Sequence, residues 1–150
     1  MTYLASFRVD GMPKAQPRAR AFARRFGNKF SARVYDPGTA EGWKAAVVAA
    51  ARSHRPASPL EGAICFDVDL FFARPKSLCR RRDPDGPIAH LAKPDRDNCE
   101  KALLDALKQD GWFRDDSQVC DGRVRKFYAA KDGRPGAQIT VREMAREEIA

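Results

Sequence analysis

The apolar residues of this chain follow two different spacings, and the order of these spacings limits the fold. A spacing of two, the pattern of a half-buried strand, marks residues 2–10, 63–72, 119–128 and 137–144. A helical spacing marks residues 41–52 and 96–109. The order is therefore strand, helix, strand, helix, strand, strand. It predicts an α+β fold in which two helices cover one mixed sheet.

Turn and cap residues mark the ends of these elements. Thr39 precedes the first predicted helix as a candidate N-terminal cap, and Gly111 follows the second as a natural stop. The run Lys131-Asp-Gly-Arg-Pro-Gly136 separates the last two strands and is typical of a turn. We therefore expect these two strands to pair as a hairpin.

Two segments follow neither spacing. Residues 12–38 combine prolines and glycines with seven cations. Residues 74–92 are rich in Pro, Gly, Asp and Arg, and they contain the run Arg80-Arg81-Arg82. We predict that both segments are basic surface loops. The whole chain, at 150 residues, has the length of a single domain with its own core.

The composition indicates a polyanionic partner. The 28 Lys and Arg residues exceed the 20 Asp and Glu residues, which gives a net charge of +8. Arg supplies 19 of these cations, and its planar guanidinium suits paired hydrogen bonds to phosphate. No apolar run approaches the roughly 20 residues that span a bilayer, so we expect no membrane association. The N-terminus lacks the profile of a secretory signal, so we expect a cytoplasmic protein.

The charge is distributed unevenly along the chain. Residues 93–121 carry a net charge of −3, whereas residues 1–92 carry +8 and residues 122–150 carry +3. A protein that holds a divalent cation against a phosphodiester needs both carboxylates at the metal and cations around them. Chance variation between short segments explains the same distribution, so net charge alone does not distinguish a metal site from a solvated surface. The positions of the individual acidic residues must distinguish them.

The acidic segment begins at the start of the second predicted helix. Pro94 favours an extended backbone at Lys93, which places Asp95 just before the helix and Asp97 in its first turn. Aspartates at a helix N-terminus commonly cap free N–H groups, and Asp97 with Glu100 has the spacing of a capping box. Taken alone, the two aspartates are better explained as caps than as ligands.

A third carboxylate favours a metal site instead. A helix over residues 97–109 is about 20 Å long, and the six extended residues from Gly111 to Asp116 cover about the same distance in return. Asp116 can therefore lie beside Asp95 and Asp97. Three carboxylates in one place repel one another unless a cation is present.

Lys101 and the type of ligand indicate the chemistry. Lys101 lies one turn after Asp97, where its ammonium can neutralise charge that develops on a phosphate or can simply pair with an aspartate of the same helix. Oxygen ligands without His or Cys favour Mg²⁺, with Mn²⁺ as a substitute, over zinc. Such an ion would polarise a phosphodiester and activate a water for hydrolysis.

Two other sets of side chains have simpler explanations. Asp67 and Asp69 alternate with apolar residues and fit the solvated face of a strand more readily than a ligand set. The four cysteines, which include no C-x-x-C pair, are Cys65, Cys79, Cys99 and Cys120. Widely spaced thiols of this kind are typically reduced, and a mixed zinc site from Cys79, His90 and Cys99 is the alternative.

The acidic segment resembles the signature of the RusA-type Holliday junction resolvases, which are small endodeoxyribonucleases often encoded by phages and prophages. The resemblance is ordered and free of gaps, and it covers Lys93–Asn98, Lys101, Ala102–Leu107 and Asp115–Val119. Residues 123–128 resemble the strand that follows in this family, and residues 11–20 resemble its Pro- and Arg-containing N-terminal element.

The resemblance implies a homodimer in which each subunit holds a Mg²⁺ site and nicks one of two opposed strands at a four-way junction. Asp95, Asp97 and Asp116 match the essential carboxylates of the family, and Lys101 matches its essential lysine. This chain departs from the family at Cys99, where an aliphatic residue is usual, and in its longer, arginine-rich N-terminal part.

These observations give one leading hypothesis and two alternatives. The leading hypothesis is a Mg²⁺-dependent, structure-selective endodeoxyribonuclease that resolves Holliday junctions in DNA recombination and repair. The first alternative is a recombination accessory protein that binds branched DNA without chemistry, and the second is a nuclease for flaps or other branched DNA. The candidate phosphate contacts are Arg18, Arg20, Arg80, Arg81, Arg82, Lys93, Arg123 and Lys126.

Overall fold

Strand β4 (Ile64–Phe72) is the central strand of the main sheet. In the computed structural model, which describes residues 2–18, 20–35 and 38–149, it pairs antiparallel with β8 (Gly136–Glu143) and parallel with β7 (Val124–Tyr128). The even-numbered residues of β4 face the core, and Asp67 and Asp69 lie on the opposite face. The alternation of residues 63–72 therefore records which face of the sheet is buried.

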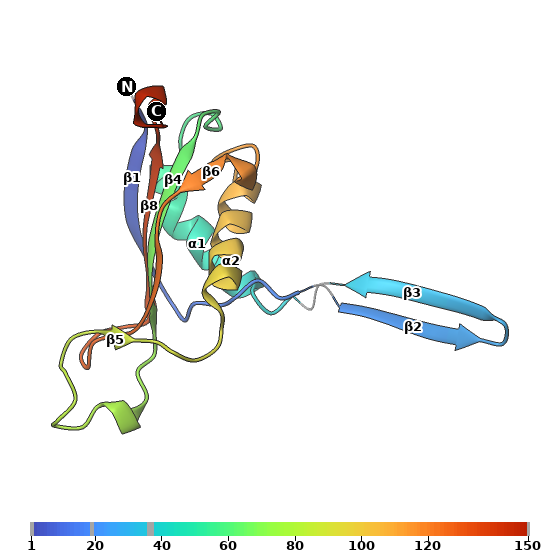
Figure 1. The fold of residues 1–150 in the computed structure, drawn as a ribbon, viewed down its shortest axis with the longest axis horizontal. Coiled ribbons are helices and arrows are strands. Elements are labelled where there is room, and N and C mark those ends of the chain that lie inside the picture. Colours follow the sequence, from blue (N-terminus) through green and yellow to red (C-terminus); the bar gives the residue numbers. More distant parts are fainter. Residues whose placement is uncertain (1, 19, 36–37, 150) are drawn as a thin grey trace.

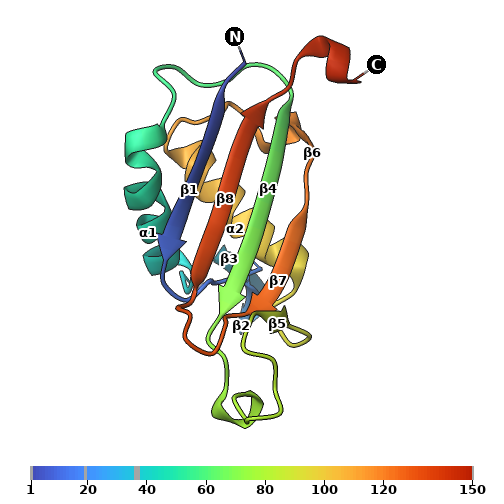
Figure 2. The same ribbon diagram turned by 90° about the vertical axis from the view of Figure 1, so that its left-hand side faces the viewer.

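Shorter strands complete this sheet on either side. β1 (Leu4–Asp10) pairs antiparallel with β8, and β5 (Ile88–Ala89) pairs antiparallel with β7. The strand order is β1-β8-β4-β7-β5, and β6 (Val119–Asp121) pairs with the start of β4. Figure 2 shows the long strands side by side in front of the helices.

Helices α1 (Glu41–Ala51) and α2 (Arg96–Gln109) cover the same face of the sheet (Figures 1 and 2). Each helix buries one stripe of apolar side chains, which in α2 includes Leu103 and Leu107. The predicted α+β fold, with one mixed sheet and two helices, is confirmed. In the part of the chain that the structure describes, no helix has the length and apolarity to cross a membrane.

The predicted hairpin of the last two strands is wrong. β8 lies between β1 and β4 and pairs with both, and β7 lies on the other side of β4. The linking residues 129–135 are long enough to pass two strand spacings of about 4.8 Å each. Ile139 and Val141 on β8 are fully buried, which suits a strand with neighbours on both sides. Alternation shows which face of a strand is buried, but it does not identify the neighbouring strand.

The predicted loop 12–38 contains a second, two-stranded sheet. β2 (Arg20–Phe26) pairs antiparallel with β3 (Lys29–Tyr35) around a turn at Gly27 and Asn28, where Gly27 has a φ of 57°. Figure 1 shows the pair extending away from the main sheet and helices. The described side chains of both strands are exposed, so the segment lacks the alternation of a half-buried strand.

Three element boundaries also differ from the expected ones. The residue before α1 is Ala40, with no side-chain capping bond, so Thr39 is not the cap. The helix ends at Ala51, and Arg52 begins a short 3-10 turn. The predicted strand 119–128 is interrupted between β6 and β7.

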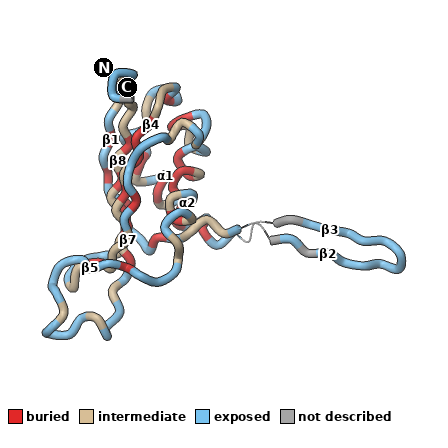
Figure 3. The backbone as a smooth tube through the Cα atoms, in the orientation of Figure 1, coloured by how far each residue is buried: buried red, intermediate tan, exposed pale blue. Residues whose placement is uncertain are grey.

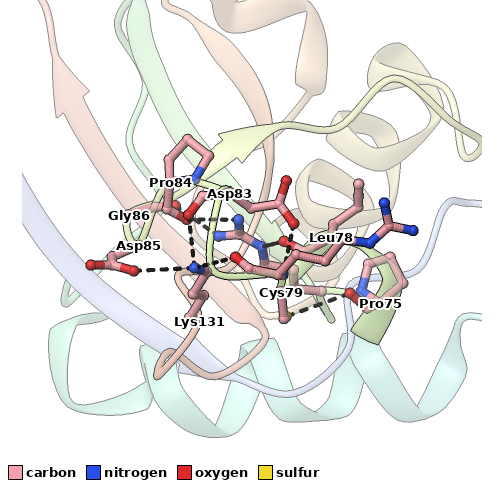
Figure 4. Close-up of polar contacts among 10 residues, drawn as sticks. Pro75, Leu78, Cys79, Asp83, Pro84, Asp85, Gly86 and Lys131 are labelled. Carbon is pink, nitrogen blue, oxygen red and sulfur yellow. Dashed lines mark hydrogen bonds and ion pairs between the residues drawn. The ribbon is translucent and has the colours of Figure 1, made fainter.

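The predicted loop 74–92 is ordered by two half-buried cations. Arg74 donates to the carbonyl oxygens of Leu78, Pro84 and Gly86 at 2.7–2.9 Å. Lys131, from the turn before β8, donates to the carbonyl oxygens of Arg80 and Asp83 at 2.7 Å and lies 3.2 Å from a carboxylate oxygen of Asp85 (Figure 4). Backbone carbonyls thus fix this loop, and β5 forms at its end.

Gly122 allows the interruption between β6 and β7. Its φ is +129°, and a Cβ atom at this position would lie 1.9 Å from the carbonyl oxygen of Phe66. The next residue, Arg123, donates its backbone N–H to Asp67 Oδ1 at 2.8 Å, after which β7 pairs regularly with β4. A residue with a side chain would therefore meet both backbone strain and a steric clash.

We predict that Gly122→Ala lowers the free energy of unfolding by about 3 kcal/mol or more, because strain and overpacking add at this position. Urea unfolding monitored by circular dichroism measures the change. Gly86→Ala is the matched control, since no atom lies within 4 Å of its Cβ position, and it should change stability by less than about 0.5 kcal/mol. Equal effects of the two substitutions would contradict the role of Gly122.

Candidate active site

The first candidate carboxylate lies at the start of α2. Asp95 occupies the N-cap position with extended backbone angles, but its side chain forms no capping hydrogen bond. Its Oδ1 atom instead accepts a 2.7 Å bond from Lys93 Nζ. This bond, together with the charges of Lys93, Lys126 and Arg18, lowers the pKa of the Asp95 carboxyl group. The capping explanation therefore does not apply to this side chain.

Asp97 and Asp116 line the same hollow. The hollow has a volume of about 230 Å³, and it is lined by Asp97, Glu100, Lys101, Leu104, Asp116 and Val119. α2 contributes the first four residues, and the chain that returns after Gly111 contributes the last two. The structure thus brings Asp116 to Asp97 and Lys101, whereas Asp95 lies outside the lining of this hollow.

A short 3-10 turn, Asp116–Gln118, orients Asp116. The preceding Asp115 caps this turn, because its carboxylate accepts a 2.9 Å bond from the N–H of Ser117. Gln118 Oε1 accepts from the N–H groups of Arg114 and Asp115, and Gln118 Nε2 donates to the carbonyl of Leu60. The bond from Ser117 is the main reason why the pKa of Asp115 is lowered. Of the two adjacent aspartates, one therefore caps the turn and the other faces the hollow.

Lysines neutralise part of this negative charge. Lys108 Nζ lies 3.8 Å from Asp116 Oδ1, and Lys101 Nζ lies 3.4 Å from Asp105 Oδ1. No hydrogen bond or ion pair joins the Asp97 carboxylate to another residue within the described ranges. Asp97 is thus the exposed acceptor of the cluster, and Lys101 shows the pairing within its own helix that the sequence offered as an alternative.

Glu100 is a site residue that the sequence analysis did not identify. Its side chain lines the hollow and is half-buried, and burial raises the pKa of its carboxyl group. It also lines a second hollow of about 260 Å³ with Arg96, Arg123 and Arg125. The spacing of three residues from Asp97 could have indicated it, but that spacing was assigned to a capping box. The carboxylates and the arginines thus adjoin at Glu100.

The acidic oxygens around the hollow fit a hard divalent cation such as Mg²⁺ by chemistry. Nevertheless, no three Asp, Glu, His or Cys side chains within residues 2–18, 20–35 and 38–149 lie close enough together to hold an ion. An ion held by Asp97 and Asp116 would require these two side chains to turn toward each other. The contact between Lys108 and Asp116 would have to open for that movement.

The predicted DNA contacts fall into different surroundings. Arg18 and Lys93 lie near Asp95, and Arg123 lines the second hollow beside Glu100. Arg80, Arg81 and Arg82 are exposed on the ordered loop beyond β4. Arg20 is the first residue of β2, and its side chain lies outside the described part of the structure.

Lys126 has structural contacts that the sequence analysis did not identify. Its ammonium donates to the carbonyl oxygens of Ala92 and Pro94 at 2.8 and 2.6 Å, and it is half-buried. An ammonium group has three N–H donors, so these two bonds do not exclude a phosphate contact, which stays a prediction. The two bonds fix the segment that leads to Asp95.

The other candidate ligand sets have structural roles. Asp67 accepts the N–H of Arg123, and Asp69 accepts two bonds of 2.7 and 2.8 Å from the Arg125 guanidinium. All four cysteines are free, and the alternative zinc site does not form among the described residues. Cys99 lies in the core of the α2 interface, where burial raises the pKa of its thiol to about 11. It packs there as a small apolar side chain.

Comparison with known proteins identifies the family. The chain is 33% identical over 144 residues to the uncharacterized protein YqaN of Bacillus subtilis (strain 168), which covers 93% of this chain and 96% of that protein. It is 45% identical over 53 residues to the crossover junction endodeoxyribonuclease RusA of Escherichia coli (strain K12) and to that of Enterobacteria phage 82, over 35% of this chain and 42% of each relative. Residues 10–142 match the family described as Endodeoxyribonuclease RusA. The chain therefore belongs to the RusA family of endodeoxyribonucleases.

Proposed function

We propose that this protein is a Mg²⁺-dependent, structure-selective endodeoxyribonuclease that resolves four-way DNA junctions by paired symmetrical nicks in recombination and repair. The observation that carries the proposal is the hollow that joins Asp97, Glu100 and Asp116 to Lys101, in a chain of the RusA family. Two opposed nicks require two sites, so the active form is a twofold homodimer.

The residues of the hollow, together with Asp95 beside it, would have different roles in phosphodiester hydrolysis. Asp97 and Asp116 would hold Mg²⁺ or Mn²⁺, and Asp95 would join them once Lys93 releases it. A bound ion of this kind polarises the phosphodiester and lowers the pKa of a water. The ammonium of Lys101 would then stabilise the negative charge that develops on the phosphate. Arg123, on the adjoining hollow, would hold a neighbouring phosphate in place.

The alternative is a branched-DNA-binding protein without chemistry. The ion pairs of Asp95 with Lys93 and of Asp116 with Lys108 favour it, because they neutralise two of the three family carboxylates without a metal ion. Both functions use the same basic surface, so only a cleavage assay separates them.

A labelled synthetic four-way junction tests the proposal. We expect paired symmetrical nicks in Mg²⁺ and none in EDTA. Asp97→Asn should reduce the cleavage rate by at least about a hundredfold, because it removes an anionic oxygen ligand. Junction affinity measured in EDTA should stay within about threefold of the parent, since Asp97 lends no attraction to phosphate.

The matched control for this variant is Asp132→Asn, which removes an exposed aspartate from the turn before β8, and it should cleave like the parent. A gel shift without product in Mg²⁺ would support the non-catalytic alternative. Faster cleavage of a flap of the same sequence than of the junction would favour the flap nuclease. An Asp97→Asn variant as fast as the parent would contradict the assigned mechanism.

Lys126 provides a second test of the site. We predict that Lys126→Met lowers the cleavage rate about tenfold and raises the Mg²⁺ concentration needed for half-maximal rate, because the segment before Asp95 loses its two hydrogen bonds. Lys126→Arg, which keeps the donors, should recover most of this activity. The junction affinity of Lys126→Met in EDTA should be unchanged. A weaker affinity with a salt dependence reduced by about one phosphate contact would show that Lys126 binds DNA directly.

A further inference from the structure

The arm formed by β2 and β3 has a composition that the proposed active site does not explain. Residues 20–35 contain five cations and no acidic residue. Two large apolar side chains, Phe26 and Phe30, flank the turn at the end of the arm and are 59% and 74% exposed. Both rings are open to a partner, and the five cations around them favour an anionic one.

The arginines of the arm lie against these rings. The guanidinium carbon of Arg24 lies 4.9 Å from the centre of the Phe26 ring, and that of Arg25 lies 5.7 Å from the centre of the Phe30 ring. The register of the arm places the first pair on one face of the ribbon and the second pair on the other face. Each ring therefore carries a flat cation on one side and exposes much of its remaining surface.

The base of the arm is fixed beside the candidate active site. The backbone N–H of Gln16 donates to the carbonyl oxygen of Asn98 in the first turn of α2, at 2.9 Å. Asn98 directly follows Asp97. The seven residues of each strand extend the arm by about 20 Å from that point (Figures 1 and 3). DNA held at the hollow is thus within reach of the arm.

We propose that this arm binds branched DNA, with its cations on the phosphates and with Phe26 and Phe30 stacked on unpaired bases at the branch point. A two-stranded ribbon fits a DNA groove, and aromatic side chains stack on any base that is free of its partner. A fully paired duplex offers the phosphates but not the free base faces. The arm therefore gives a preference for branched over linear DNA. The inference rests on the proposed function, because it takes branched DNA as the ligand.

Binding assays in EDTA test the arm separately from cleavage. The double variant Phe26→Ala/Phe30→Ala should bind a four-way junction at least about tenfold more weakly than the parent. It should bind a duplex of the same sequence within about threefold of the parent. Arg24→Ala/Arg25→Ala should weaken binding to both DNAs alike and reduce the salt dependence by about two phosphate contacts. Leu4→Ala is the matched control, since Leu4 is 64% exposed on β1, outside the arm.

A direct signal comes from Phe30→Trp, whose exposed indole should be quenched by the junction and much less by the duplex, whereas Leu4→Trp should respond to neither. Equal losses of Phe26→Ala/Phe30→Ala on junction and duplex, or no quenching, would overturn the stacking. A change of oligomeric state in sedimentation would overturn it in favour of a contact between two copies. A parent that binds through the arm but cleaves no DNA would refute the proposed function alone.

Discussion

Burial of the apolar stripe of α2 against the sheet determines where the acidic side chains of the site lie. Cys99, Leu103 and Leu107 are fully buried on one side of the helix, so Asp97 and Lys101 must face the other side. Burial of the residues that follow α2 likewise fixes the course of the returning chain. Trp112 and Phe113 are buried, and the carbonyl of Trp112 accepts a 2.8 Å bond from the N–H of Leu60. Asp116 therefore returns along α2 because the hydrophobic core fixes both ends of the turn.

This arrangement places like charges close together, and the chain compensates with its own lysines. The argument from the sequence assumed that three carboxylates need a bound cation to offset their repulsion. Lys93 and Lys108 reduce that repulsion by pairing with Asp95 and Asp116. Both pairs are open to solvent, which weakens their attraction, so each opens at little cost. Lysines of this kind protect a carboxylate site from repulsion and still allow an incoming ion to replace them.

The sequence predicted the positions of the helices and strands better than it predicted which strands pair. The helical spacing over residues 96–109 and the alternation over residues 63–72 located α2 and β4, because burial of one face selects those patterns directly. Strand order depends on pairing between distant segments, and for that reason the hairpin of the last two strands was wrong. β2 and β3 were missed because an arm exposed on both faces needs no apolar period. Gly122 was missed because a close approach between two backbones leaves no mark in apolar spacing.

The same limit applies to the site. The approximate lengths of α2 and its return were enough to bring Asp116 to Asp97, since both are set by backbone dimensions. The surroundings of individual side chains were not accessible in this way. Glu100 lines the second hollow with Arg96 and Arg123, and Arg123 lies between β6 and β7, in a part of the chain that the spacing of α2 says nothing about. Two of the three donors of Lys126 are likewise bonded to carbonyls 32 and 34 residues away in the chain.

In the proposed function, the separation of the arm from the hollow would resolve a conflict between cations that attract DNA and carboxylates that hold a metal ion. Cations close to the carboxylates attract DNA, but they would also compete with a metal ion for oxygens such as those that Lys93 and Lys108 contact. Charges separated by more than about 10 Å are largely screened at physiological salt. The arm extends about 20 Å, so the cations near its tip would attract phosphates without weakening a cation held by Asp97 and Asp116. A basic surface concentrated on a projecting ribbon thus adds DNA affinity at no cost to metal affinity, which the same arginines placed around α2 would not do.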